Sequence, residues 1–260
     1  MRDPSIKRRV AEGPNLDPSP VCVLPGCGRP TLQAEGRGLS PFHCGYHVKL
    51  KARHGSFLCR TIRAPHLKPY VTAATAWLKV NAMDPEVATA VADVAWSMPH
   101  PREAVRADEV RTKLPKEKVR IAMARLRKAG IRPERLVAIH MAITALIAED
   151  ADADRSDEYR LVQVGKAVHR LASGTHREGV LGRNSTVPRN PHAIRRDIYP
   201  QSSGRVLRFL GSTIEAACGH LTAQHLPAII ALKTERFGPH PSQVPGWVPR
   251  WKRELLAARL

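Results

Sequence analysis

Four residues that commonly bind metal ions lie close together near the start of this 260-residue chain. They form two pairs: Cys22 and Cys27 are separated by Val-Leu-Pro-Gly, and Cys44 and His47 are separated by two residues. Zinc in structural sites takes four sulfur or nitrogen ligands in a tetrahedron, usually from two such pairs that folding brings together. The Pro-Gly dipeptide between the first two thiols favours the turn that this requires. The sequence therefore predicts a Cys3His zinc module.

A basic helix is expected to follow the second ligand pair. It carries Lys49, Lys51 and Arg53 and should end at Gly55, because glycine readily adopts the left-handed conformation found after helix ends. We expect these three basic side chains to contact nucleic acid.

The fourth ligand is not settled by spacing alone. His43 and His54 are alternatives to His47, and Cys59 is a potential further ligand. Three buried free cysteines and a surface histidine would produce the same residues without a metal. Three of the five cysteines nevertheless fall between positions 22 and 44, which favours the metal site.

This stretch resembles a small zinc-binding motif of phage and mobile-element proteins, which often precedes the nuclease centre of HNH-type homing endonucleases. The resemblance covers about 35 residues of the 260 and implies a module that binds nucleic acid without doing chemistry itself. It departs from the motif where Ser40-Pro41-Phe42-His43 is inserted before Cys44, which keeps His43 open as a ligand. The matching residues are Cys22-x4-Cys27-Gly-Arg-Pro, Arg37-Gly38-Leu39, Cys44-x2-His47 and Lys51-x-Arg53-His54-Gly55.

Net charge points to a polyanionic partner. The chain carries a formal charge of +19, with 12 basic against 4 acidic residues over 1–69, 15 against 14 over 70–160, and 15 against 5 over 161–260. A nearly neutral middle between two basic ends suggests a scaffold with two surfaces that face nucleic acid, most often double-stranded DNA.

The apolar content is mostly aliphatic, since aromatic residues make up only 5% of the chain. Abundant Ala and Leu favour helices, so we expect a mainly α fold in which a small N-terminal zinc module precedes an α-helical bundle. The expected organisation is a disordered basic tail (1–20), the zinc module (21–65), a helical domain (66–173), a basic irregular arm (174–203), and C-terminal helices with a Pro/Trp tail (204–260).

Local signals place the helices within this plan. Asp84-Pro85 should cap and open one helix, Ser156 should cap another, and Gly130 should end a third. The most apolar segment, residues 136–148, is expected at the centre of the core, with His140 buried and hydrogen-bonded. Helices are expected over residues 70–80, 85–98, 107–114, 116–130, 157–173, 204–220 and 221–237, after a connector over 58–68.

The segment from residue 101 to 130 has the outline of a helix-turn-helix unit: a short helix, a break at Pro115 and a second helix with a basic side. We expect Arg120, Arg125, Arg127 and Lys128 on that side to form a second nucleic-acid surface. A bundle helix with a solvated basic face is the alternative.

The remaining expectations concern the arm and the tail. Arg195 and Arg196 could contact phosphates from the arm, unless the arm is simply disordered. Trp247 and Trp251 suggest a segment that folds back or binds a protein partner. Residues 1–20 lack the apolar core of a secretory signal, and no apolar run approaches the roughly 18 residues that span a bilayer, so we expect a cytoplasmic protein of a bacterium or phage.

These features favour a zinc-containing DNA-binding protein, acting as a regulator or a recombination or assembly accessory of a phage or mobile element. An HNH-related endonuclease is an alternative, but no His-Asn-His arrangement in a strand-strand-helix context follows Gly55. An RNA-binding protein is a second alternative, although aromatic stacking platforms are scarce. A third alternative is a structural protein in which a zinc ion stabilises a small subdomain.

Overall fold

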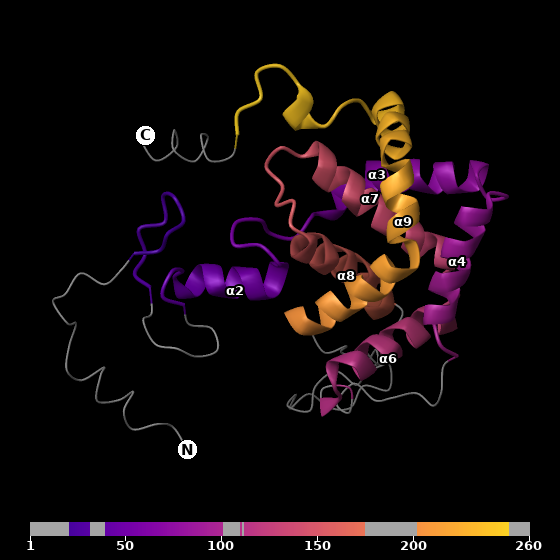
Figure 1. Ribbon diagram of the computed structural model, residues 1–260, viewed down its shortest axis with the longest axis horizontal. Helices are drawn as coiled ribbons and strands as arrows, with labels where there is room; N and C mark the ends of the chain where they lie inside the picture. Colours follow the sequence, from indigo (N-terminus) through magenta and orange to yellow (C-terminus); the bar gives the residue numbers. More distant parts are fainter. Residues whose placement is uncertain (1–20, 32–39, 101–109, 111, 175–201, 250–260) are drawn as a thin grey trace, which may run out of the picture. The chain divides into compact units, whose positions relative to one another are not determined.

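The protein is mainly helical, as expected, in a computed structural model that describes residues 21–31, 40–100, 110, 112–174 and 202–249. Seven α-helices and no strand occur in these ranges (Figure 1). Arg195, Arg196, Trp251, the N-terminal tail, most of the expected arm and half of the expected 107–114 helix lie outside them. The helices are α2 (Gly45–His54), α3 (Ala64–Val80), α4 (Pro85–Ser97), α6 (Pro115–Lys128), α7 (Pro133–Glu149), α8 (Asp157–Gly174) and α9 (Gly204–Phe237).

The chain divides into two compact units, Met1–Lys51 and Ala52–Leu260. The division falls within α2, so the expected zinc module, residues 21–65, extends past it. Helices α3 to α9 belong to the second unit. The segments expected as separate domains, 66–173 and 204–260, therefore share one unit.

Most helix boundaries follow the local signals. The Asp84 carboxylate accepts hydrogen bonds from the backbone N–H groups of Glu86 (2.8 Å) and Val87 (3.4 Å), which caps α4 as predicted. Ser156 accepts from the Tyr159 N–H group (3.4 Å) at the start of α8. Gly130 has a φ of 68° just after α6.

Two boundaries differ from the prediction. Helix α3 begins at Ala64, so the expected connector over 58–68 is wrong in its second half. Proline suits the first turn of a helix, where its missing N–H group would have no partner, and Pro65 occupies that position. The two C-terminal helices form the single 34-residue helix α9, which accommodates Pro227 in its interior.

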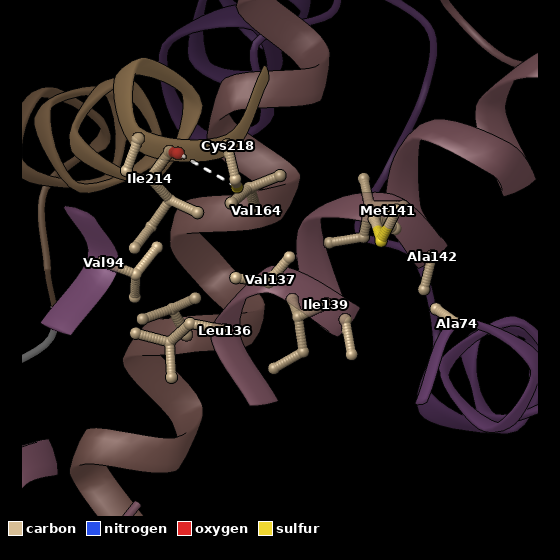
Figure 2. Packing of buried hydrophobic residues seen from close by; sticks show 14 of the residues in the cluster. Ala74, Val94, Leu136, Val137, Ile139, Met141, Ala142, Val164, Ile214 and Cys218 are labelled. Carbon is tan, nitrogen blue, oxygen red and sulfur yellow. Dashed lines mark hydrogen bonds between the residues drawn. The ribbon is translucent and has the colours of Figure 1, made fainter. Parts of the chain in front are cut away.

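Helix α7 is the centre of the core, which confirms the prediction for residues 136–148. It packs against α3, α4, α8 and α9 (Figure 1). Its Leu136, Met141 and Ile143 side chains are at most 1% exposed, and Figure 2 shows apolar side chains of these helices converging around it. Cys218 is buried there, as predicted, and its thiol donates to the Ile214 carbonyl oxygen (3.2 Å).

Helices α8 and α9 cross at very short range through a reciprocal pair of glycines. A Cβ atom on Gly165 of α8 would lie 2.2 Å from the Leu207 carbonyl oxygen of α9. A Cβ atom on Gly211 of α9 would lie 2.0 Å from the Leu161 carbonyl oxygen of α8. Non-bonded carbon and oxygen atoms cannot approach so closely, so any side chain at either position would push the helices apart.

His140 of α7 is fully buried and hydrogen-bonded, as predicted. Its Nδ1 atom lies 2.7 Å from the Thr222 hydroxyl oxygen, and its Nε2 atom lies 2.7 Å from a carboxylate oxygen of Glu215. The Arg160 guanidinium lies 3.1 Å from the other Glu215 oxygen. The hydrogen bond with His140, the main cause, and the charges of His140 and Arg160 lower the pKa of Glu215 although burial opposes them. This network joins α7, α8 and α9.

After α9 the chain forms a short 3-10 turn, Pro241–Gln243, which contacts the end of α7. The Ser242 hydroxyl (2.9 Å) and the Gln243 side-chain amide (3.0 Å) both donate to the Glu149 carbonyl oxygen at the end of α7. Carbonyl groups in the last turn of a helix lack partners within the helix, so this turn serves as a cap.

Candidate metal centre and basic surfaces

Four side chains of the first unit converge as predicted. The three thiol sulfurs of Cys22, Cys27 and Cys44 and a ring nitrogen of His47 all lie within 4.8 Å of one another. The His47 Nδ1 atom is 3.4 Å from the sulfur of Cys22, 3.5 Å from that of Cys27 and 3.3 Å from that of Cys44. The sulfurs of Cys27 and Cys44 are 3.7 Å apart.

These separations fit a tetrahedral zinc ion. Zinc–sulfur bonds of about 2.3 Å and zinc–nitrogen bonds of about 2.0 Å imply edges of about 3.8 Å between sulfurs and about 3.5 Å between sulfur and nitrogen. The four edges given above lie within a few tenths of an ångström of these values. The four side chains are therefore positioned to hold a metal ion, and thiolate and imidazole donors together are typical of zinc.

The alternative ligands have other partners. The Nδ1 atom of His43 lies 3.5 Å from the Ser40 hydroxyl oxygen, His54 contacts Lys166, and the Cys59 thiol donates to the Asp152 carbonyl oxygen. His47 therefore completes the cluster, as predicted. The inserted residues 40–43 do not displace it.

Backbone turns bring the ligands together. The Cys22 N–H group donates to the Arg29 carbonyl oxygen (2.8 Å), and the Cys27 N–H group donates to that of Leu24 (3.1 Å). Gly26 within this turn has a φ of 74°, a conformation that glycine adopts without steric cost. Cys44 lies directly before α2 and its carbonyl oxygen accepts from Val48 (3.1 Å), which places the second ligand pair on the first turn of the helix.

The electrostatic setting prepares some of these ligands for metal binding. Burial acts to raise the pKa of Cys22, but hydrogen bonds from the backbone of Cys44 and Leu24 and from the neighbouring thiols outweigh it and lower that pKa. Burial raises the pKa of Cys27. Burial and the charges of Arg29 and His43 lower the pKa of His47, which favours the neutral ring that binds metals.

The basic side chains of α2 are divided between two sides of the helix. Lys49 and Arg53 are exposed and four residues apart, so they share one side. Lys51 is half-buried, and a residue two positions away from Lys49 points to the nearly opposite side. Of the three basic side chains predicted to contact nucleic acid, Lys49 and Arg53 therefore lie on one side of α2, and Lys51 lies on the other.

An arginine–aromatic pair lies beside Lys49 and was missed by sequence reasoning. The Arg29 guanidinium lies 4.6 Å from the ring centroid of Tyr46, and both side chains are exposed. Tyr46 precedes Lys49 by three residues and so lies on the same side of α2. The sequence Cys27-Gly28-Arg29 could have indicated this pair, because Arg29 comes just after the turn that carries two of the candidate ligands.

Helix α6 is amphipathic as predicted, but its basic side is smaller than expected. Lys116, Arg120 and Lys128 are exposed. Arg125 is only 8% exposed, so its expected position on the solvent side is wrong. Arg127 is half-buried and donates to the Ala95 carbonyl oxygen (2.9 Å).

Arg125 is buried because it lies at the border of the apolar stripe of α6, where its long aliphatic stem can be covered by neighbouring helices. Its charge lies close to His169 of α8. Burial, the main cause, and this charge lower the pKa of His169 to about 4. Arg125 therefore acts within the packing of α6, which removes it from the candidate nucleic-acid surface.

Comparison of the chain with protein families, with curated proteins and with solved structures finds no match. Within the part of the chain that the structure describes, no helix has the length and apolar character needed to cross a membrane.

Proposed function

We propose that this chain is a zinc-containing DNA-binding protein that acts as a regulator or as a recombination or assembly accessory of a phage or mobile element. The observation that carries the proposal is the Cys3His cluster at tetrahedral spacing next to an exposed Arg29–Tyr46–Lys49 group. Because four protein side chains supply all the ligands, the site has the composition of a closed, structural zinc site.

When bound, zinc supplies a cross-link between the Cys22–Cys27 turn and the first turn of α2. The residues around the zinc site determine which chemical groups the module presents to a partner. Lys49 and Arg53 offer ammonium and guanidinium groups to phosphates, and Arg29 is held against the Tyr46 ring. Lys116, Arg120 and Lys128 of α6 offer a second set of cations.

The overall charge of +19 supports a polyanionic partner. Neutralising several phosphates releases condensed counterions, so affinity should fall steeply as salt is raised. Duplex DNA is the partner we favour, because Lys49, Arg53, Lys116, Arg120 and Lys128 lie on helices, and a helix fits the major groove. Binding unpaired bases needs several stacking rings, and aromatic residues make up only 5% of the chain.

The first test concerns zinc. The purified chain is expected to contain one zinc ion by elemental analysis, and Cys22→Ser, Cys44→Ser and His47→Gln should each reduce this content. His43→Gln is the matched control, since it changes a histidine one position from Cys44 that lies outside the cluster. Equal zinc loss in the two histidine variants, or zinc content independent of all four residues, would contradict the assignment.

The second test concerns nucleic acid. Binding of the zinc-loaded chain to duplex DNA, single-stranded DNA and duplex RNA is measured by fluorescence anisotropy over a series of salt concentrations. We expect the tightest binding to duplex DNA, with a linear decline of log affinity against log salt. Weaker binding by Lys49→Gln with its zinc content intact would link the module to this partner. If none of the three nucleic acids shows salt-sensitive binding, the proposed function is wrong.

A further inference from the structure

Lys166 of α8 contacts residues that precede it by more than 100 positions. Its ammonium nitrogen lies 2.5 Å from the Nδ1 atom of His54 and 2.8 Å from the Thr61 hydroxyl oxygen. The same hydroxyl oxygen lies 3.0 Å from the His54 Nδ1 atom. The three polar groups form a triangle within the second unit, and all three residues are half-buried.

Neighbouring contacts hold this triangle in place. Gln163, one turn before Lys166, is 2% exposed; its amide donates to the His54 carbonyl oxygen (3.2 Å) and its oxygen accepts from the Ile62 N–H group (3.0 Å). Gly55 has a φ of 81° and packs so closely that a Cβ atom would lie 2.6 Å from the Glu158 carbonyl oxygen. The chain on both sides of the triangle is thus attached to α8.

The charges that shift the pKa values of His54 and Lys166 are all positive. Burial, followed by the charges of Lys166, Arg53 and Arg60, lowers the pKa of His54 to about 4. Burial, followed by the charges of Arg170 and Arg53, lowers the pKa of Lys166 to about 8. Bringing these like charges together costs free energy, which a bound anion would offset.

Two other cations of this unit are paired with carboxylates, whereas Arg127 donates to the Ala95 carbonyl oxygen. Lys233 lies 2.8 Å from Glu149, and Arg208 lies 2.5 Å from Glu158. Lys166 instead contacts an imidazole and a hydroxyl group. Lys166 thus lies among neutral polar groups and other positive charges, an arrangement that a ligand carrying negative charge would stabilise.

The donors available here match a phosphate group. An ammonium group has three N–H donors, and His54 and Thr61 account for two of them. Because the neutral His54 ring accepts at Nδ1, its Nε2 atom carries the proton and is a donor. The exposed Arg53 guanidinium group adds a planar donor pair of the kind that binds phosphate oxygens, and the charges of Arg60 and Arg170 add to the positive potential there.

We propose that Arg53, His54, Arg60, Thr61, Lys166 and Arg170 form a binding site for a phosphate group of the nucleic-acid backbone. The inference rests on the proposed function for the source of that phosphate, because free phosphate or pyrophosphate has the same chemistry. It adds to that function a fixed phosphate contact in the helical unit, separate from the Cys3His cluster.

The test uses the full, zinc-loaded chain and the variant Lys166→Met. Lys79→Met is the matched control, because Lys79 is an exposed lysine of the same unit, on α3. Inorganic phosphate and pyrophosphate, compared with chloride at equal ionic strength, should raise the Tm of the wild type and of Lys79→Met in a saturable way. They should not raise that of Lys166→Met. Arg170→Gln changes an exposed side chain and should show a smaller rise, which provides a second variant if Lys166→Met is poorly folded.

The second arm measures duplex DNA binding over a salt series. Loss of one phosphate contact should reduce the slope of log affinity against log salt by about 0.9, which is about an eightfold weaker affinity at 0.1 M salt. If Lys79→Met loses as much, the change reflects overall charge, and the site assignment is wrong. Saturable stabilisation by pyrophosphate without any DNA binding would retain the anion site, refute its nucleic-acid source and defeat the proposed function. DNA binding that Lys166→Met and Arg170→Gln leave unchanged, with no stabilisation by either anion, would overturn this inference alone.

Discussion

Replacing Gly211 with alanine is expected to destabilise the helical unit by forcing α8 and α9 apart. The new Cβ atom would lie 2.0 Å from the Leu161 carbonyl oxygen, whereas such atoms rarely come closer than about 3 Å. The clashing atom belongs to the backbone, so no side-chain rotation can relieve it. The helices would have to separate by about 1 Å at their crossing.

The size of the effect follows from two opposing terms. Overpacking a well-filled interior costs about 1–3 kcal/mol, and a rigid backbone partner places this substitution at the upper end. Alanine in a helix interior is favoured over glycine by about 1 kcal/mol. The free energy of unfolding should therefore fall by about 2 kcal/mol, which corresponds to a decrease in Tm of about 4–8 °C for a unit of this size.

Urea unfolding followed by circular dichroism measures this change. Ser212→Ala is the matched control on the same helix, because it places alanine at an exposed position next to Gly211. The control should be as stable as the wild type or slightly more stable. If Gly211→Ala matches Ser212→Ala within about 0.5 kcal/mol, the close crossing does not require glycine and the reasoning fails.

Two further predictions concern two histidines of the helical unit. His140→Ala should lower the free energy of unfolding by about 3 kcal/mol, because it leaves Glu215 and Thr222 without their buried partner; a loss below about 1 kcal/mol, measured by urea unfolding, would show that the network contributes little. The pKa of His169 is about 4 in the folded protein against 6.5 ordinarily. Between these values the unfolded chain binds more protons than the folded protein. The stability that the neutral His169 ring contributes is therefore fully present above pH 6.5 and is lost as pH falls toward 4. His169→Gln should flatten this part of the stability–pH curve by up to about 3 kcal/mol, and an unchanged slope would contradict the cause assigned here.

Local signals predicted much of the fold because the interactions that begin and end helices are local. The Asp84 cap forms with N–H groups two and three residues away, and the Ser156 cap forms with one three residues away. The failure at α3 has the same origin. A connector was expected over residues 58–68, although Pro65 stands where the first turn of a helix tolerates proline.

The metal centre was predictable as a set of candidates. Pair spacing named the cysteines, because a turn and a helix start can each present two ligands to one ion. Spacing did not distinguish His43 from His47, since that choice depends on which ring faces the thiols after the turns have formed. The burial of Arg125 could not be predicted from the sequence either, because a side chain at the border of an apolar stripe is exposed or covered according to which helix packs beside it.

The sequence alone determined the helical class, the capped starts of α4 and α8, the central place of α7 and the identity of the three thiol ligands. All of these depend on residue type, short-range hydrogen bonds and apolar periodicity. Only the tertiary structure decided that His47 faces the thiols, that Gly165 and Gly211 set the α8–α9 crossing, and that Lys166 meets His54 and Thr61. The physical reason is that these contacts join residues far apart in sequence, and their geometry arises only when whole helices pack.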